Sequence, residues 1–463
     1  MIALLAFAVT QKIHLEAEDA QQLGTHVEAS RPGYSGSGYS TGFTKDGDRL
    51  VWHVKGKAGI YSVHIRYSSP HAQKGFDFGV NGFKTSGMFS PTGDDFEVCA
   101  AGRVELTDGD NEVELDKGWG YYDVDSVDLV PTKVDSHLPK PPSKPCDPKA
   151  TAEARKLFEF LRSKYGGKTL SGQYGAKDNQ FVLSSAKVLP AIVGDDFIDY
   201  SPSRLAFGAD PKHAVENQIA NARKGQIVTM SWHWNAPDHL LNKHIKDAQG
   251  RDIDASWYKG FYTNATTFDL SEALDHPDSQ DHKLILRDID AIAVQLEKFQ
   301  RAKVPVLWRP LHEAEGGWFW WGAKGPEPFK KLWKLMYRRL TVEHHLHNLI
   351  WVYSSGTNPD WYPGDEFVDI VGIDAYPSDQ RDPLSSTWDE LADRFKGKKL
   401  LAITEFGGVP DVERMHRFGV NWSYFVSWVG SIGSGSTDAE RLSRLYKESR
   451  VLNANGLPKF TGE

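Results

Sequence analysis

Residues 287–313 read RDIDAIAVQLEKFQRAKVPVLWRPLHE, and this stretch sets the pattern for the larger part of the chain. Apolar residues first recur at helical spacing, and a short apolar run typical of a buried strand begins at residue 305. Similar strand-like runs begin at residues 169, 191, 226, 348, 368, 400 and 422. Eight alternating strand–helix units predict an α/β fold, a (β/α)8 TIM barrel over residues 150–463. An open doubly wound sheet is the alternative, but no Gly-rich phosphate loop follows the first strand.

The N-terminal part of the chain has a different pattern. Residues 12–131 hold short alternating runs, such as GIYSVHIRYSS at 59–69, which are separated by Gly, Asn and Asp. Such runs are typical of an all-β sandwich. Residues 132–149 are rich in proline and predict an extended, semi-rigid linker between the sandwich and the barrel. Because a linker of this kind tethers two separate sites, we expect a monomer.

Composition narrows the classes of partner. The chain has 463 residues and a net charge of −8, which argues against nucleic acid or an anionic membrane as partner. It contains 15 Trp and 17 Tyr, more than a core of this size needs. About half of these rings would pack in the core, and the others are expected to line a groove whose flat aromatic faces meet sugar rings.

The cysteines and the N-terminal residues indicate the cellular compartment in which the protein works. The two cysteines, Cys99 and Cys146, imply neither a metal site nor a disulfide framework, and a single bridge between them is left open. The apolar run Ile2 to Val9 is too short to span a membrane and is interpreted as the remnant of a secretion signal. Together with the glycosylation patterns at Asn264 and Asn421, it predicts a secreted, extracellular protein.

The carboxyl ends of the predicted barrel strands hold the candidate chemistry. The fourth strand leads to Glu313 and the seventh to Glu405, among Trp, His and Arg residues and without a Ser or Cys nucleophile or a metal-ligand cluster. In a TIM barrel these two strands lie on roughly opposite sides of the mouth. Two carboxylates placed in this way suit the hydrolysis of a glycosidic bond. The alternative, a strand-end Glu in a salt bridge, is plausible for one of them and much less so for both.

The motifs around these glutamates resemble glycoside hydrolase family 26 β-mannanases. The fourteen-residue run WRPLHEAEGGWFWW at 308–321 is similar to the acid/base segment of that family, and ITEFG at 403–407 resembles its nucleophile segment. The resemblance covers about residues 150–460. It implies an endo-β-1,4-mannanase that retains anomeric configuration, with Glu313 as general acid and base and Glu405 as nucleophile. Glu315 is a second carboxylate nearby, but the His-Glu match favours Glu313.

The resemblance and the strand positions also assign the sugar-binding residues. Direct sugar contact is expected from His233, Trp234, His312, Trp318, Trp321 and Trp428. The hydroxyl of Tyr376 is expected to bond to Glu405 beside the substrate. Arg309 is expected to face the barrel interior and steady a carboxylate, with a purely structural ion pair as the alternative. Trp257 would bind more distant sugars, although surface packing explains it equally well.

Residues 12–131 resemble carbohydrate-binding module family 35. The matching stretches include LEAE at 15–18, GYSGSGY at 33–39 and VDSVDL at 124–129. The resemblance implies a structural Ca²⁺ held by Glu16, Glu18 and Asp125, with a solvated acidic edge strand as the alternative. Trp119 and Tyr121 are expected to stack on a wall polysaccharide, and core packing is the alternative for both.

Three other functions compete with the mannanase reading. Related barrels hydrolyse β-glucan or xylan, and mannose preference rests on the resemblance alone. A non-catalytic polysaccharide-binding protein would keep the sugar groove without the chemistry, but both glutamates are present. A transglycosylase would differ in the acceptor, a sugar in place of water. No catalytic cofactor is expected for any of them. The expected partners are mannan polysaccharides and manno-oligosaccharides.

Overall fold

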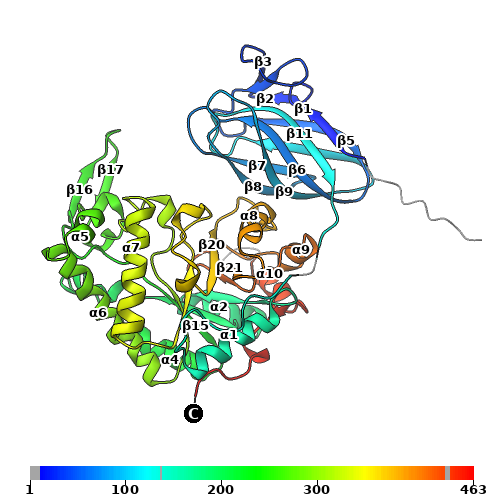
Figure 1. Cartoon of the computed structure of the whole chain (residues 1–463). Helices are drawn as coiled ribbons and strands as arrows, with labels where there is room; N and C mark the ends of the chain where they lie inside the picture. Colours follow the sequence, from blue (N-terminus) through cyan, green and yellow to red (C-terminus); the bar gives the residue numbers. More distant parts are fainter. Residues whose placement is uncertain (1–10, 136–137, 433–437, 463) are drawn as a thin grey trace, which may run out of the picture. The chain divides into compact units, whose positions relative to one another are not determined.

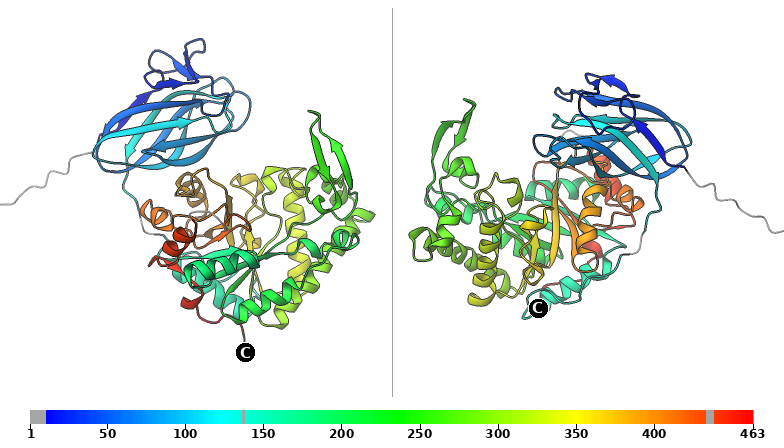
Figure 2. Two further views of the ribbon diagram at one scale, coloured as in Figure 1. Left: turned by 180° about the vertical axis from the view of Figure 1, so that it is seen from behind. Right: turned by 45° about the horizontal axis from the view of Figure 1, so that its top comes forward.

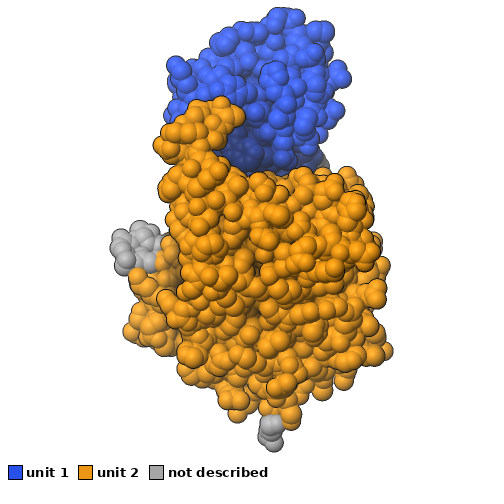
Figure 3. All heavy atoms as spheres, turned by 90° about the vertical axis from the view of Figure 1, so that its left-hand side faces the viewer, with its two compact units in different colours: residues 1–137, 376–394, 410–420 blue, residues 138–375, 395–409, 421–463 orange. Residues whose placement is uncertain are grey.

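The computed structural model describes residues 11–135, 138–432 and 438–462, and Figure 1 shows their elements in chain order. Backbone contacts divide them into two compact units, which are coloured separately in Figure 3. The first unit combines the N-terminal residues with Tyr376–Arg394 and Pro410–Val420. The second contains most of the remaining chain from Leu138 onward. The apolar run Ile2 to Val9 lies outside the described residues.

The N-terminal residues form two antiparallel sheets. One sheet holds β1 (Ile13–Glu16), β3 (His26–Glu28), β4 (Tyr39–Thr41), β6 (Gly59–Ser68), β9 (Glu97–Leu106) and β11 (Asp123–Pro131). The other holds β2 (Gln21–Leu23), β5 (Arg49–Gly56), β7 (Lys74–Val80), β8 (Phe83–Phe89) and β10 (Gly109–Asp116). Every second residue of β6, from Tyr61 to Tyr67, is buried, as the alternating sequence predicts. These buried residues join one core between the sheets.

The second unit contains a closed barrel of eight parallel strands. They are β13 (Gly172–Tyr174), β14 (Ile192–Asp196), β15 (Ile227–Ser231), β18 (Val306–Arg309), β19 (Leu349–Tyr353), β20 (Ile370–Ala375), β21 (Leu400–Phe406) and β22 (Phe425–Ser427). The closure is made by β22 and β13, which pair through Gln173 and Ser427. Each strand falls within a run read from the sequence, so the (β/α)8 prediction is confirmed.

Helices and short sheets complete the chain. The helices are α1 (Ala152–Lys164), α2 (Ala176–Ala186), α3 (Pro202–Leu205), α4 (Ala214–Arg223), α5 (Leu270–Asp275), α6 (Gln280–Arg301), α7 (Pro326–Tyr337), α8 (Ser385–Phe395), α9 (Val412–Arg417) and α10 (Asp438–Leu445). Helices such as α1, α4 and α6 lie outside the barrel strands (Figure 2). The short pairs are β12 (Thr169–Leu170) with β23 (Val451–Leu452), and the hairpin β16 (Lys243–Lys246) with β17 (Asp252–Ala255). None of the helices in the described part of the chain is long and apolar enough to cross a membrane.

The fourth barrel strand ends earlier than the sequence predicts. β18 stops at Arg309, because Pro310 has no N–H to continue the ladder. Leu311 and Glu313 then adopt left-handed backbone angles, with φ of +51° and +53°. The predicted strand was therefore four residues too long. The turn places Glu313 on a loop beyond the barrel mouth, where its backbone N–H donates to the carbonyl of Ser354.

Cys99 and Cys146 do not pair. Both are free thiols in the structure. Burial raises the pKa of the Cys99 thiol to about 12, and burial with the nearby Asp369 carboxylate raises the pKa of Cys146 well above its ordinary value. Neither thiol is therefore a thiolate at neutral pH, and the bridge left open by the sequence is not formed.

Candidate active site

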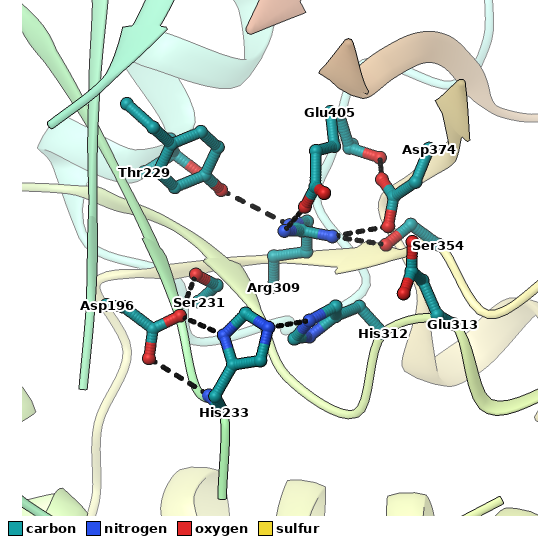
Figure 4. Close-up of polar contacts among 12 residues, drawn as sticks. Asp196, Thr229, Ser231, His233, Arg309, His312, Glu313, Ser354, Asp374 and Glu405 are labelled. Atoms are coloured by element: carbon teal, nitrogen blue, oxygen red, sulfur yellow. Dashed lines mark hydrogen bonds and ion pairs between the residues drawn. The ribbon is translucent and has the colours of Figure 1, made fainter. Parts of the chain in front are cut away.

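Polar side chains gather where the barrel strands end. Asp196 closes β14, Arg309 closes β18, Asp374 lies near the end of β20, and Glu405 lies near the end of β21. The strands are parallel, so their carboxyl ends form one rim of the barrel. Figure 4 shows these side chains together with Glu313 and His233. The predicted carboxylates are thus brought into one cluster by chain segments far apart in the sequence.

Arg309 lies at the centre of this cluster and is fully buried. Its guanidinium donates to Glu405 at 2.7 Å and to Asp374 at 2.7 Å. It also donates to the hydroxyls of Tyr174 and Ser354, both at 3.2 Å. A planar guanidinium suits such a divided set of acceptors, since its five donors have fixed directions. Arg309 therefore fixes the buried Glu405 in place and compensates its charge.

Asp374 supports Arg309 from the other side. The hydroxyl of Thr404 donates to Asp374 at 2.7 Å, so the carboxylate has a fixed position between two strands. Burial raises the pKa of Asp374, although Arg309 opposes this effect, and the charge of Glu313 adds to the rise. Asp374 and Glu405 thus share the single guanidinium of Arg309, so one positive charge serves two carboxyl groups.

Glu313 lies in an environment that favours its protonated form. Burial raises the pKa of Glu313, and the nearby charge of Glu405 raises it further, while Arg309 opposes both. The indole N–H of Trp318 donates to Glu313 Oε2 at 3.0 Å. The environment of Glu313 therefore favours its acid form, whereas Glu405 is ion-paired with Arg309. This contrast between two carboxyl groups is the arrangement that a general acid and a nucleophile require.

His233 is held between Asp196 and His312. Its Nδ1 lies 2.6 Å from Asp196 Oδ2, and its Nε2 lies 3.1 Å from His312 Nε2. Burial alone would lower the pKa of His233, but the Asp196 carboxylate outweighs it and raises the pKa. His312 is buried as well, and burial together with the charges of Arg309 and His233 lowers its pKa well below the ordinary value. His312 is therefore neutral.

A family model named "Glycosyl hydrolase family 26" matches residues 146–456. The chain belongs to this family. A second model, "Carbohydrate binding module (family 35)", matches residues 13–132 of this family 26 chain. A mannan endo-1,4-beta-mannosidase of Thermothelomyces thermophilus is 42% identical over 444 residues, which cover 94% of the chain and 89% of that protein.

Two solved structures match nearly the whole length of the chain. A Podospora anserina GH26-CBM35 beta-(1,4)-mannanase has a TM-score of 0.69 and 39% identity, and the match covers 97% of this family 26 chain and 99% of the other. A ruminal GH26 endo-beta-1,4-mannanase has a TM-score of 0.65 and 26% identity over 96% and 98% of the two chains. The family resemblance read from the sequence is thereby confirmed.

The predicted sugar-binding aromatic residues of the family 26 chain fall into two groups. Trp318 is 46% exposed beside Glu313. Trp428 is partly exposed, and its ring lies 4.8 Å from Tyr174 and 5.7 Å from His233. Trp257 stacks against the half-exposed Phe207 with centroids 5.4 Å apart. These three rings present a surface to solvent, and their contact with sugar stays a prediction.

The other two predicted tryptophans are packing residues. Trp234 and Trp321 are completely buried. The indole of Trp234 donates to Asp288 at 2.8 Å and stacks on Trp232, while Trp321 donates to the backbone carbonyl of His312 at 2.9 Å. Direct sugar contact, predicted for both, is therefore wrong, because neither ring has any exposed surface.

Burial corrects one further prediction and agrees with another. His312 is fully buried and contacts His233, so it has no surface for a sugar. Arg309 is fully buried and donates to Glu405, as expected of a residue that faces the barrel interior and steadies a carboxylate. Both ring nitrogens of His233 already have partners within the protein, and its side chain is 14% exposed. Tyr376 is 56% exposed, and its hydrogen bond to Glu405 stays a prediction.

Sequence reasoning missed three residues of the cluster. Asp196 and Asp374 are carboxylates at or near strand ends, and the same signal predicts Glu405. Tyr174 lies at the end of β13, and its hydroxyl accepts from Arg309. Applying the strand-end criterion to all eight strands would have found them.

The family 35 module exposes two of its predicted residues. Trp119 is 65% exposed and Tyr121 is 56% exposed, on the loop between β10 and β11. Core packing, the alternative for both, is therefore wrong. Met88 on β8 is 39% exposed, and the ammonium of Lys74 lies 5.5 Å from the Tyr121 ring centre. The result is an aromatic surface bordered by a cation, which suits a sugar ligand.

Of the three predicted calcium ligands, Glu16, Glu18 and Asp125, Asp125 has other partners in the structure. The carboxylate of Asp125 is fully buried and bonds to the guanidinium of Arg66 and to the backbone and hydroxyl of Ser35. The charge of Asp125 is therefore already compensated by Arg66. No group of three His, Cys, Asp or Glu residues in the described ranges is arranged to hold a metal ion. Asp125 as a calcium ligand is thus corrected.

Proposed function

We propose that this chain is an endo-β-1,4-mannanase that cleaves internal bonds of mannan, glucomannan and galactomannan with retention of configuration. The observation that carries the proposal is the pair Glu313 and Glu405. Burial raises the pKa of Glu313, which favours its acid form, and Glu405 is ion-paired with Arg309. The mannosidase that is 42% identical over 94% of the chain supports mannose as the preferred sugar.

The first half of the reaction uses both glutamates. Glu313 transfers its proton to the glycosidic oxygen as the bond from that oxygen to the anomeric carbon breaks. A carboxylate oxygen of Glu405 forms a new bond to the anomeric carbon and gives a glycosyl ester. Glu405 loses its negative charge in this step while Glu313 gains one. The net charge of the cluster therefore does not change, and Arg309 remains paired with Asp374 throughout.

The second half reverses these roles. Glu313, now a carboxylate, takes a proton from water, and the water oxygen attacks the anomeric carbon. The ester bond breaks and Glu405 recovers its charge beside Arg309, which already has the correct position. A fixed guanidinium needs no rearrangement when the charge returns, and such preorganisation lowers the barrier. No cofactor takes part in either step.

The test is a substrate panel. Reducing-sugar release is measured from mannan, glucomannan, xylan and mixed-linkage β-glucan, with Glu313→Ala and Glu405→Ala as controls. Release from the mannans that is lost in both variants is expected. Release only from xylan or β-glucan would keep the chemistry and change the substrate class. An inactive wild-type protein would favour a polysaccharide-binding function instead.

We infer secretion as the setting of this activity, because the substrate is an insoluble wall polysaccharide. Asn264 is exposed, whereas Asn421 is 3% exposed. An exported protein made in a eukaryotic host is expected to carry a glycan on Asn264 and none on Asn421. Mass spectrometry of the two peptides before and after glycan removal decides this. An unmodified Asn264 would count against export through that route. We expect a monomer that binds neither nucleic acid nor membrane.

A structural calcium ion in the family 35 module is the remaining proposal. Glu18 Oε2 is buried and has no hydrogen-bond partner among the described residues. A side chain added at Gly36 would clash with Glu18 and lie against Glu16, so both carboxylates converge on this turn. A hard divalent cation fits two such carboxylates and nearby carbonyl oxygens. Chelation should lower the melting temperature and added Ca²⁺ should restore it. An unchanged melting temperature would contradict the proposal.

A further inference from the structure

Asp196 is held more firmly than a side chain at a strand end requires. Its Oδ2 accepts from the hydroxyl of Ser231 at 2.6 Å and lies 2.6 Å from His233 Nδ1. Its Oδ1 accepts from the backbone N–H groups of His233 at 2.9 Å and Ile198 at 2.7 Å. Burial would raise the pKa of Asp196, but the charge and hydrogen bonds of His233 and Ser231 lower it to about 2. Asp196 is therefore ionised at any pH at which the protein works.

The contact between the imidazole rings of His233 and His312 restricts where their protons lie. His233 Nε2 faces His312 Nε2 at 3.1 Å, so one of these nitrogens carries a proton. His312 is neutral, and its Nδ1 has no partner among the described residues. The Asp196 carboxylate raises the pKa of His233, which favours the protonated ring. A protonated His233 donates from both nitrogens, to Asp196 on one side and to the Nε2 lone pair of neutral His312 on the other.

We propose that Asp196 is a positioning residue for the glycosidase reaction, holding His233 as a second buried cation that faces the two glutamates alongside Arg309. Figure 4 shows the His233 ring between Asp196 and His312, on the side of the cluster that leads to Glu313. The inference rests on the proposed function. It assigns Asp196 no contact with the sugar, because its carboxylate is enclosed by its four donors.

A positive charge on His233 would partly offset the negative charges of the carboxylates in the cluster. The charged and titratable groups that interact with it are Asp196, His312, Arg309, Glu405 and Glu313. The other neighbours, Trp428, Phe261 and Phe319, are uncharged rings. Arg309 is already divided between Asp374 and Glu405, so a protonated His233 adds a second positive charge that acts on both Glu405 and Glu313. The same cation opposes a further rise in the pKa of Glu313.

The test is Asp196→Asn, with Asp195→Asn as the matched control. Asp195 is the preceding residue of β14, points to the other face of the strand and bonds to Gln218 at 3.0 Å. Steady-state rates on a soluble manno-oligosaccharide are measured from pH 4 to pH 9. In Asp196→Asn we expect kcat to fall about 100-fold with KM little changed, since small misplacements of reacting groups cost this much. The alkaline limb should also move to higher pH, because Glu313 loses a neighbouring cation. Asp195→Asn should match the wild type in both.

Combining His233→Gln with Asp196→Asn tests whether Asp196 acts through His233 or whether its loss disturbs the structure generally. His233→Gln alone should move the alkaline limb upward, and adding Asp196→Asn to it should cause no further upward move. If Asp196→Asn does not fold, His233→Gln carries the test alone. An unshifted limb and wild-type kcat in Asp196→Asn, or an equal upward shift in the His233→Gln background, would overturn the proposal. A wild-type protein inactive on every polysaccharide would instead refute the proposed function.

Discussion

At the scale of single residues, Arg309 is the residue that holds the carboxylates of the site together. The sequence predicts that it steadies a carboxylate but does not identify both of its partners. Arg309 is fully buried and pairs with Asp374 and Glu405 at 2.7 Å each. A buried charge whose partner is removed remains uncompensated, which costs far more than an exposed pair contributes. The shared guanidinium therefore links the stability of the barrel mouth to the ionisation of the proposed nucleophile.

Replacing Arg309 should affect stability and turnover together. Arg309→Met leaves two buried carboxylates without their cation, and we expect a loss of about 3–5 kcal/mol in the free energy of unfolding, along with a large fall in kcat. Arg301→Met is the control, because Arg301 is 75% exposed in an i,i+4 pair on α6 and should change stability by about 0.5 kcal/mol or less. Urea denaturation measures both. Equal stability of the two variants would show that the buried network is unimportant.

The pKa of Glu313 sets the alkaline limit of activity. Burial and Glu405 raise this pKa, and the acid must be protonated to work, so activity should persist above the ordinary Glu range and fall as pH rises through the raised pKa. Glu313→Gln should lose at least about 100-fold in kcat on mannan and should lose this limb. Glu315→Gln, two residues away, should keep it, since Glu315 accepts from the backbone N–H of Asn358. A limb that disappears in Glu315→Gln would reassign the acid.

At the scale of elements, the segment after β18 shows what the sequence can and cannot specify. Alternating strand and helix patterns predicted all eight barrel strands, and strand ends predicted both glutamates. The exposure of Trp318 and the burial of Trp321 could not be read from the same run of aromatic residues. Which ring is covered depends on segments distant in the chain, such as the loop that brings Tyr262 against Phe319.

In the segment after β15, too, contacts with distant parts of the chain decide which rings are buried. Trp232 and Trp234 stack with centroids 4.2 Å apart, and both are covered, while His233 between them faces the cluster. The partner of Trp234 is Asp288 of α6, more than fifty residues away, so no local spacing rule identifies it. Position at a strand end predicts that a residue is near the site, and tertiary contacts decide whether it can meet the substrate.

Two tryptophan variants should therefore behave differently. Trp321→Ala removes a fully buried indole and is expected to destabilise the protein by about 3–5 kcal/mol. Trp318→Ala removes a half-exposed ring that bonds to Glu313, so kcat/KM should fall while the free energy of unfolding stays within about 1 kcal/mol of wild type. Denaturation curves and rates on the same samples distinguish them. The opposite pattern would show that the exposures found here do not hold in solution.

At the scale of the whole molecule, one chain carries two exposed aromatic surfaces, and we expect each of them to contact sugar. The family 35 module exposes Trp119 and Tyr121, and the barrel exposes Trp318 near its carboxylates. A module that holds insoluble polysaccharide raises its effective concentration near a tethered active site. A soluble oligosaccharide gains nothing from such tethering, so the two substrate forms report on the two surfaces separately.

The aromatic surface of the module should thus matter only for insoluble substrate. Trp119→Ala with Tyr121→Ala should reduce binding to insoluble mannan at least tenfold, because stacked aromatic residues supply most of such contacts. Rates on a soluble manno-oligosaccharide should not change. Val98→Ala, which truncates a 61% exposed side chain on β9, is the control and should bind like wild type. Undiminished binding by the double variant would move the ligand to another face of the module.

The central claim is that Glu405 is the nucleophile and Glu313 the acid and base. Azide rescue of Glu405→Ala and Glu313→Ala, with an activated β-mannoside and NMR of the products, tests it most directly. In Glu405→Ala, azide should replace the missing carboxylate and give the α-mannosyl azide. In Glu313→Ala, azide should attack the glycosyl ester and give the β-mannosyl azide. The reversed pair of anomers would exchange the roles of the two residues, and no azide adduct from either variant would contradict the double-displacement account.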